Sequence, residues 1–199
     1  KMKDHATAGV TLAMKNCFGI TPCTSYVTGA GKDEPRLTPA GGRGMFHDGL
    51  RQPSKSAPQE RDHTVPKEGG ARVPRIVADI VAARPIHLSI VEGIDTMAGG
   101  EGPWTGPGLK VVNPKLLVAG LNPVATDAVC MRLMNYDPMA KRGTPPFESS
   151  DNMLALAEEL GAGSRDANLI DVSDVAIEKA KFDFAALREA KKKIPGARV

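Results

Sequence analysis

The sequence has few aromatic residues, few cysteines and no long apolar run. Phe, Trp and Tyr make up 4% of the 199 residues, so we expect a core built mainly from Val, Ile, Leu, Ala and Met. The 3 cysteines include no C-x-x-C pair, which argues against a disulfide framework and against a zinc or iron–sulfur motif. No stretch approaches the roughly 20 apolar residues of a transmembrane helix, so we expect no membrane span.

The chain also lacks a strong excess of either charge. It carries 26 Lys and Arg against 23 Asp and Glu, a net charge of +3. This balance does not indicate a nucleic-acid partner. Part of the basic excess is the run Lys191-Lys192-Lys193, which we expect to be the solvated end of a helix, where cations suit the helix dipole. No secretion signal is visible and we expect a soluble chain, but neither its compartment nor its oligomeric state is predicted.

What is present is typical of a globular protein: 41% of the residues are hydrophobic and 25% are charged. The length suits a single domain over residues 1–199 with a sizeable core. Because the first residues read as the middle of a structural unit, we expect an N-terminal part of that domain to be missing. The 21 Gly and 16 Pro commit much of the chain to turns and shaped loops.

Helical and strand patterns alternate along the chain. We expect helices over residues 6–18, 73–83, 123–134, 150–160 and 184–193, and strands over 1–5, 86–91, 116–119 and 169–172. The runs at 86–91 and 116–119 are largely apolar, as in strands buried on both faces. The pattern therefore predicts an α/β fold with a mostly parallel sheet flanked by helices. Residues 20–70 show no periodicity and are interpreted as a long irregular loop or insertion.

The opening segment gathers polar side chains that could hold an anion. Alternation along a strand places Lys1, Lys3 and His5 on one face, and the following helix adds Thr11, Lys15 and Asn16. Ammonium groups, a titratable imidazole and a helix N-terminus at one place would attract a small anionic ligand. In the alternative reading, the lysines are solvated and His5 only hydrogen-bonds the helix start.

A glycine-rich loop over residues 93–108 follows one of the apolar strands, at the strand end where open α/β sheets place their ligands. Glycines such as Gly100 and Gly102 would let backbone N–H groups approach a ligand. The carboxylates Glu92, Asp95 and Glu101 are suitable ligands for Mg²⁺, Ca²⁺ or Mn²⁺. An ordinary turn with surface acids explains the same residues.

Asp127 lies near the start of a predicted helix that directly follows an apolar strand. An acid at this place is stabilised by the helix dipole, which explains the residue without any function. The functional interpretation is that Asp127 faces the glycine-rich loop and completes a cluster of metal-binding carboxylates.

Four motifs follow one another along the chain. They are Lys1-Met2-Lys3-Asp4-His5 with the subsequent Gly9-Val10-Thr11, Lys15-Asn16 and Phe18-Gly19; Val91-Glu92-Gly93-Ile94; Gly100-Glu101-Gly102-Pro103; and Ala119-Gly120-Leu121-Asn122-Pro123-Val124-Ala125-Thr126-Asp127-Ala128. In this order they resemble the domain of unknown function 362 (DUF362) family, over most of the chain to about Gly163. The resemblance implies an α/β domain that sometimes sits beside ferredoxin-like iron–sulfur modules. This chain has Glu92 where the family usually has Asp.

The leading hypothesis is an enzyme-like domain that binds a small anion, with a divalent metal as an additional expectation. Lys1, Lys3, Thr11, Asn16, Gly100 and Gly102 would bind the ligand, and His5, Lys15 and Asp127 would be catalytic. The expected metal ligands are Glu92, Asp95, Glu101 and Asp127. The alternative is a non-catalytic module that binds a partner protein through residues 20–70.

Overall fold

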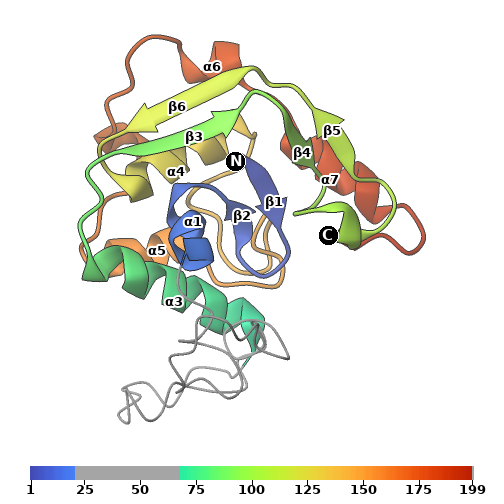
Figure 1. Ribbon diagram of the computed structural model, residues 1–199, viewed down its shortest axis with the longest axis horizontal. Helices are drawn as coiled ribbons and strands as arrows, with labels where there is room; N and C mark the ends of the chain where they lie inside the picture. Colours follow the sequence, from blue (N-terminus) through green and yellow to red (C-terminus); the bar gives the residue numbers. More distant parts are fainter. Residues whose placement is uncertain (21–67, 199) are drawn as a thin grey trace, which may run out of the picture.

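The chain begins with an antiparallel hairpin and not with a long helix. The computed structural model (Figure 1) describes residues 1–20 and 68–198. Strands β1 (Lys3–His5) and β2 (Gly9–Thr11) pair, and helix α1 (Ala13–Ile20) follows directly. The helix predicted over 6–18 is therefore wrong in its first half, because the buried residues Val10 and Leu12 are two apart, which is the period of a strand. The insertion predicted over residues 20–70, with its interaction role, falls almost wholly outside the described residues.

The other predicted helices are confirmed with shifted ends. They are α3 (Gly69–Ala83), α4 (Pro123–Leu133), α5 (Met153–Glu159) and α7 (Phe184–Lys192), and α6 (Ile177–Ala180) is an additional short helix. Helix α4 starts as its sequence predicts: the Asn122 side chain accepts a hydrogen bond from the N–H of Ala125, and Pro123 occupies the first turn. The strand predicted over 169–172 does not form, and the short 3-10 helix η3 (Ala167–Leu169) occupies its start.

The expectation of a mostly parallel sheet flanked by helices is wrong. Within the described residues the strands form three two-stranded sheets, and each is antiparallel: β1–β2, β3–β6 and β4–β5. Strand β3 (Ser89–Gly93) returns as β6 (Leu116–Gly120) through β4 (Thr96–Ala98), the short 3-10 helix η2 (Pro103–Thr105) and β5 (Lys110–Val112). This connection has no crossover helix of the kind that parallel strands need.

The β3–β6 sheet also explains why its apolar runs were misinterpreted as strands buried on both faces. Helix α4 packs under one face of this sheet, whereas the opposite face carries Ile90, 62% exposed, and Leu117, 64% exposed. An apolar strand with one open face reads, in sequence, like a strand buried on both faces. The sequence pattern could therefore not distinguish the two arrangements.

One hydrophobic core joins these elements. In Figure 1 the β3–β6 sheet lies along the upper edge, α3 lies along the lower part of the fold, and the β1–β2 hairpin with α1 lies between them. Buried side chains from all of these elements share that core, with Phe18, Phe147 and Phe184 among the largest. Helix α7 packs beside β4. No helix in the described part of the chain is both long enough and apolar enough to cross a membrane.

Candidate functional site

The β1–β2 hairpin sorts its polar side chains onto two faces. Lys3 pairs with Thr11 and His5 pairs with Gly9. Alternate residues of a strand point to the same side, and so do directly opposed residues on neighbouring strands. Lys3, His5 and Thr11 therefore share one face of the hairpin, whereas Asp4 belongs to the other and is fully buried.

Glu101, in the loop between β4 and β5 (residues 99–109, called here the β4–β5 loop), meets the first of these faces. The Lys3 ammonium donates a hydrogen bond to the main-chain oxygen of Glu101 over 2.7 Å. The Nε2 atom of His5 lies 2.7 Å from the carboxylate atom Oε2 of the same residue. The structure thus joins the opening motif and the glycine-rich loop, as the sequence interpretation expected for these residues.

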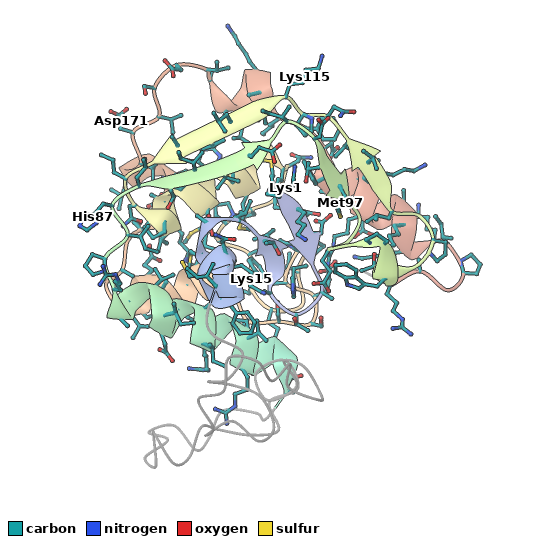
Figure 2. All side chains as sticks on the ribbon, viewed as in Figure 1. Lys1, Lys15, His87, Met97, Lys115 and Asp171 are labelled. Atoms are coloured by element: carbon teal, nitrogen blue, oxygen red, sulfur yellow. The ribbon has the colours of Figure 1, made fainter. Side chains whose placement is uncertain are left out.

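Lys15 adds a second ammonium group to this cluster. It lies on α1 (Figure 2) and is only 6% exposed, with Nζ 4.3 Å from the centre of the Phe18 ring. Its positive charge lowers the pKa values of both His5 and Glu101, which places it in their electrostatic neighbourhood. We name this cluster the hairpin–loop site and define it by Lys3, His5, Thr11, Lys15 and Glu101.

The hydrogen bonds of His5 define which of its nitrogens carries the proton. The backbone N–H of Thr7 donates to Nδ1 over 3.1 Å, so Nδ1 acts as an acceptor. The N–H at Nε2 then donates to the Glu101 carboxylate. Burial lowers the pKa of His5, and although the hydrogen bond to Glu101 opposes this effect, the shift remains downward. His5 is therefore held as a neutral Nε2–H donor near pH 7.

Glu101 is held in its charged form. Burial alone would raise the pKa of its carboxyl, but the hydrogen bond from His5 and the positive charges of Lys15 and Lys3 outweigh burial and keep the pKa below its ordinary value. The hairpin–loop site thus combines a neutral imidazole and a carboxylate with the ammonium groups of Lys3 and Lys15. The hydroxyl oxygen of Thr11 is buried and has no hydrogen-bond partner among the described residues.

Asp127 does not belong to this cluster, because its carboxylate caps helix α1. Oδ1 accepts a hydrogen bond from the N–H of Ala13 over 2.8 Å, and Oδ2 accepts one from Met14 over 3.0 Å. These N–H groups belong to the first turn of a helix, where no partner within the helix exists. Burial raises the pKa of Asp127 to about 7, although both hydrogen bonds act to lower it. Asp127 thus supports the helix that carries Lys15.

Glu92 and Asp95 lie in the turn between β3 and β4. Glu92 binds the Lys1 ammonium over 2.5 Å and accepts hydrogen bonds from the N–H groups of Ile94 and Asp95. The hydrogen bond from Lys1 is the main reason that the pKa of Glu92 falls to about 2. Asp95 accepts a hydrogen bond from the Asn113 side chain.

The four expected metal ligands are therefore not brought together. Glu92 and Asp95 share one turn, Glu101 pairs with His5, and Asp127 caps α1. In residues 1–20 and 68–198 no three His, Cys, Asp or Glu side chains converge in a way that could hold a metal ion.

The remaining ligand-binding candidates are found elsewhere. Lys1 binds Glu92 and the main-chain oxygen of Asp95 (Figure 2), and Asn16 is exposed on α1. Gly100 packs against Thr105 and the Lys191 ammonium. Gly102 packs against the Trp104 ring, and its carbonyl accepts hydrogen bonds from Thr105. These two glycines thus shape the β4–β5 loop internally.

Four residues that support the hairpin–loop site were not predicted from the sequence: Thr7, Asp4, Arg188 and Lys191. Thr7 orients His5, as described above. Asp4 accepts hydrogen bonds from the Tyr136 hydroxyl over 2.6 Å and from the Gly99 N–H over 2.7 Å, and Arg188 lies 3.8 Å from it. Lys191, expected to be solvated, is 1% exposed, so that expectation is wrong. A usable signal existed for Asp4, since strand alternation places it opposite Lys3 and His5, toward the core.

These elements define a mixed helical and antiparallel fold with a basic site between a hairpin and a glycine-rich loop. A protein-family model described as Domain of unknown function (DUF362) matches residues 1–132 of the 199. The chain therefore belongs to the DUF362 family, which confirms the resemblance read from its motifs. The match contains every residue of the hairpin–loop site and ends within α4. No similarity to a curated protein or to a solved structure is found.

Proposed function

We propose that the hairpin–loop site binds a small anion, and that His5 serves there as a neutral hydrogen-bond donor. The observation that carries the proposal is the convergence of Lys3 and His5 from strand β1 and of Lys15 from helix α1 on Glu101. Ammonium groups and an imidazole N–H gathered at one partly buried place are favourable for an anionic ligand. The hydroxyl of Thr11, which has no hydrogen-bond partner within the described residues, offers one further donor.

A carboxylate is a suitable class of anion for this site. It can accept hydrogen bonds from several donors at once, as the ammonium of Lys3 and the Nε2–H of His5 would provide. Acetate is therefore the probe for the site.

His5 is suited to donate a hydrogen bond through Nε2. Its acceptor nitrogen Nδ1 is already occupied by the N–H of Thr7, whereas Nε2–H points at Glu101. An anionic oxygen that approached Nε2 would share this hydrogen bond with Glu101. Because Glu92 and Asp127 are engaged in a turn and in a helix cap, the proposal includes no metal at these carboxylates.

Thermal unfolding in the presence of acetate tests this proposal. A ligand that binds only the folded state stabilises it by about 2.7 kcal/mol when its concentration is 100 times the dissociation constant. We expect a saturable rise in Tm for the wild type and for Lys110→Met, whose lysine is exposed and lies outside the site. In the double variant Lys3→Met/Lys15→Met the rise should disappear. An equal rise in all three proteins, or none in the wild type, would refute the proposal.

A further inference from the structure

Helix α7 presents two buried cations to the back of the hairpin–loop site. Arg188 and Lys191 are 2% and 1% exposed, although they lie one turn apart on a helix whose other basic side chains are more exposed. Arg188 binds Glu148 on one side and approaches Asp4 of β1 on the other. Lys191 reaches the β4–β5 loop. Both residues lie outside the part of the chain that the family model matches.

The contacts of Lys191 are those of a buried anchor. Its ammonium donates hydrogen bonds to the main-chain oxygen of Thr105 over 3.1 Å and to the Thr105 hydroxyl over 3.0 Å. In the described part of the chain no carboxylate lies within ion-pairing distance of it. Burying an ammonium group without a carboxylate partner is costly in free energy. The contacts that Lys191 makes in this position must offset that cost.

The β4–β5 loop fits closely around this side chain. A Cβ atom added to Gly108 would lie 2.9 Å from Cγ of Lys191, and one added to Gly99 would lie 3.0 Å from Cδ. A Cβ atom on Gly100 would come within 3.1 Å of Nζ. Glycine at these positions thus allows the loop backbone to close over the lysine stem.

Thr105, which binds Lys191, lies close to the residues on both sides of Glu101. Gly100 precedes Glu101 and packs against Thr105 and the lysine ammonium. Gly102 follows Glu101, and its carbonyl accepts hydrogen bonds from the N–H of Thr105 over 3.0 Å and from the Thr105 hydroxyl over 2.7 Å. The backbone that follows Glu101 is therefore hydrogen-bonded to Thr105, the backbone that precedes it lies close to Thr105, and Thr105 is hydrogen-bonded to Lys191.

We infer that Lys191 is a positioning residue that holds the β4–β5 loop so that the Glu101 carboxylate meets Nε2 of His5. The hydrogen bonds of Lys191 go to Thr105, so Lys191 acts through Thr105 and the loop backbone. The inference rests on the proposed function for its biological meaning, since it concerns the alignment of the same site. Its geometry can nevertheless be tested in the protein without any ligand.

The test is a comparison of the His5 imidazole ¹⁵N signals and their pH titration among ligand-free variants. Glu101→Gln serves as the reference for a broken pair, and Lys193→Met is the control, since Lys193 is an exposed lysine of the same segment. We expect Lys191→Met to move the Nε2 signal and the His5 titration in the same direction as Glu101→Gln, while Lys193→Met matches the wild type. A merely stabilising lysine would lower Tm without moving either signal.

Thr105→Val keeps the inference testable if Lys191→Met fails to fold. This change keeps the side-chain shape and removes the Thr105 hydroxyl, which accepts a hydrogen bond from Lys191 and donates one to Gly102. The hydrogen bond from Lys191 to the main-chain oxygen of Thr105 remains. We therefore expect the His5 signals to shift in the same direction as in Lys191→Met, but by less. Wild-type His5 signals in Thr105→Val, or in a folded Lys191→Met, would overturn the inference. Because no anion is present, such a result would leave the acetate experiment unaffected, and a failure of acetate to bind would leave this one unaffected.

Discussion

Nε2 of His5 lies 2.7 Å from Oε2 of Glu101, and this contact joins strand β1 to the β4–β5 loop. The N–H of Thr7 occupies the opposite nitrogen of the ring, so the imidazole is fixed in one tautomer and one orientation. Burial, together with the nearby charges of Lys15 and Lys3, lowers the pKa of His5, and the hydrogen bond from His5 with the same charges lowers the pKa of Glu101. The site is therefore arranged electrostatically before any ligand enters it.

The His5–Glu101 pair predicts the titration of His5. Its pKa should lie below the ordinary value of 6.5, chiefly because the ring is buried. Glu101→Gln should lower the pKa further, since the hydrogen bond and the charge of Glu101 both favour the imidazolium form. The ring ¹⁵N shifts followed by NMR against pH measure this directly, with the exposed Glu159→Gln as control. A pKa above 6.5 in the wild type would contradict the description of the pair.

Asp127→Ala should destabilise the fold more than an ordinary surface substitution. It removes both hydrogen bonds to the first turn of α1 and leaves the N–H groups of Ala13 and Met14 without acceptors. Each unsatisfied group costs about 1–3 kcal/mol. Denaturant unfolding should therefore show a loss of at least about 2 kcal/mol for the two groups together. The exposed Asp171→Ala should change stability by no more than about 0.5 kcal/mol. Equal losses in the two variants would show that the cap contributes little.

The buried carboxyl of Asp127 also gives stability a defined pH dependence. Its pKa rises from 3.8 to about 7 on folding, so between these values the folded protein keeps a proton that the unfolded chain releases. The contribution of Asp127 is thus fully present below pH 3.8 and is lost as the pH rises through about 7. The free energy of unfolding of the wild type minus that of Asp127→Asn should fall across this window, by up to about 1.4 kcal/mol per pH unit. A difference that grows with pH would contradict the raised pKa.

The fit of the β4–β5 loop around Lys191 predicts a contrast between two glycines. Gly108 and Gly161 both have left-handed backbone angles, with φ +84° and +75°. An alanine at either position pays a conformational cost of roughly 1–2 kcal/mol. Only at Gly108 would its Cβ also approach neighbouring side chains, 2.6 Å from Cδ1 of Ile194 and 2.9 Å from Cγ of Lys191. Gly108→Ala should therefore lower the free energy of unfolding more than Gly161→Ala. Equal losses would mean that the loop does not close tightly over Lys191.

The parts of the fold that depend on local chemistry could be predicted from the sequence. The Asn122 cap and Pro123 define the start of α4 within one turn, and strand alternation places Lys3 and His5 on one face. The direction of β6 relative to β3 could not be predicted, because it depends on the path of the intervening chain. The apolar pattern of Ile90 and Leu117 gave no sign that one sheet face is open.

The roles of Asp127 and Lys191 could not be predicted from the sequence for a related reason. Asp127 lies near the start of one helix but caps another, α1, which is distant in the sequence. Lys191 belongs to a run of three lysines that reads as a solvated helix end, yet its ammonium is buried against Thr105. The partners of Asp127 are backbone N–H groups, and one of the two partners of Lys191 is a main-chain oxygen, whereas backbone groups leave no signature in a sequence. The family motifs located the site without giving these roles.

The most direct measurement of the central claim is an NMR titration of the His5 imidazole signals with acetate at constant pH and ionic strength. If Lys3, His5 and Lys15 form an anion site around Glu101, the Nε2 signal should shift and saturate in the wild type and in Lys110→Met. Each of Lys3→Met and Lys15→Met should weaken binding by roughly tenfold or more, since a hydrogen bond to a charged group contributes about 1.5–3 kcal/mol. An Nε2 signal that does not respond to acetate, or that responds in Lys3→Met and Lys15→Met as strongly as in the wild type, would contradict the account.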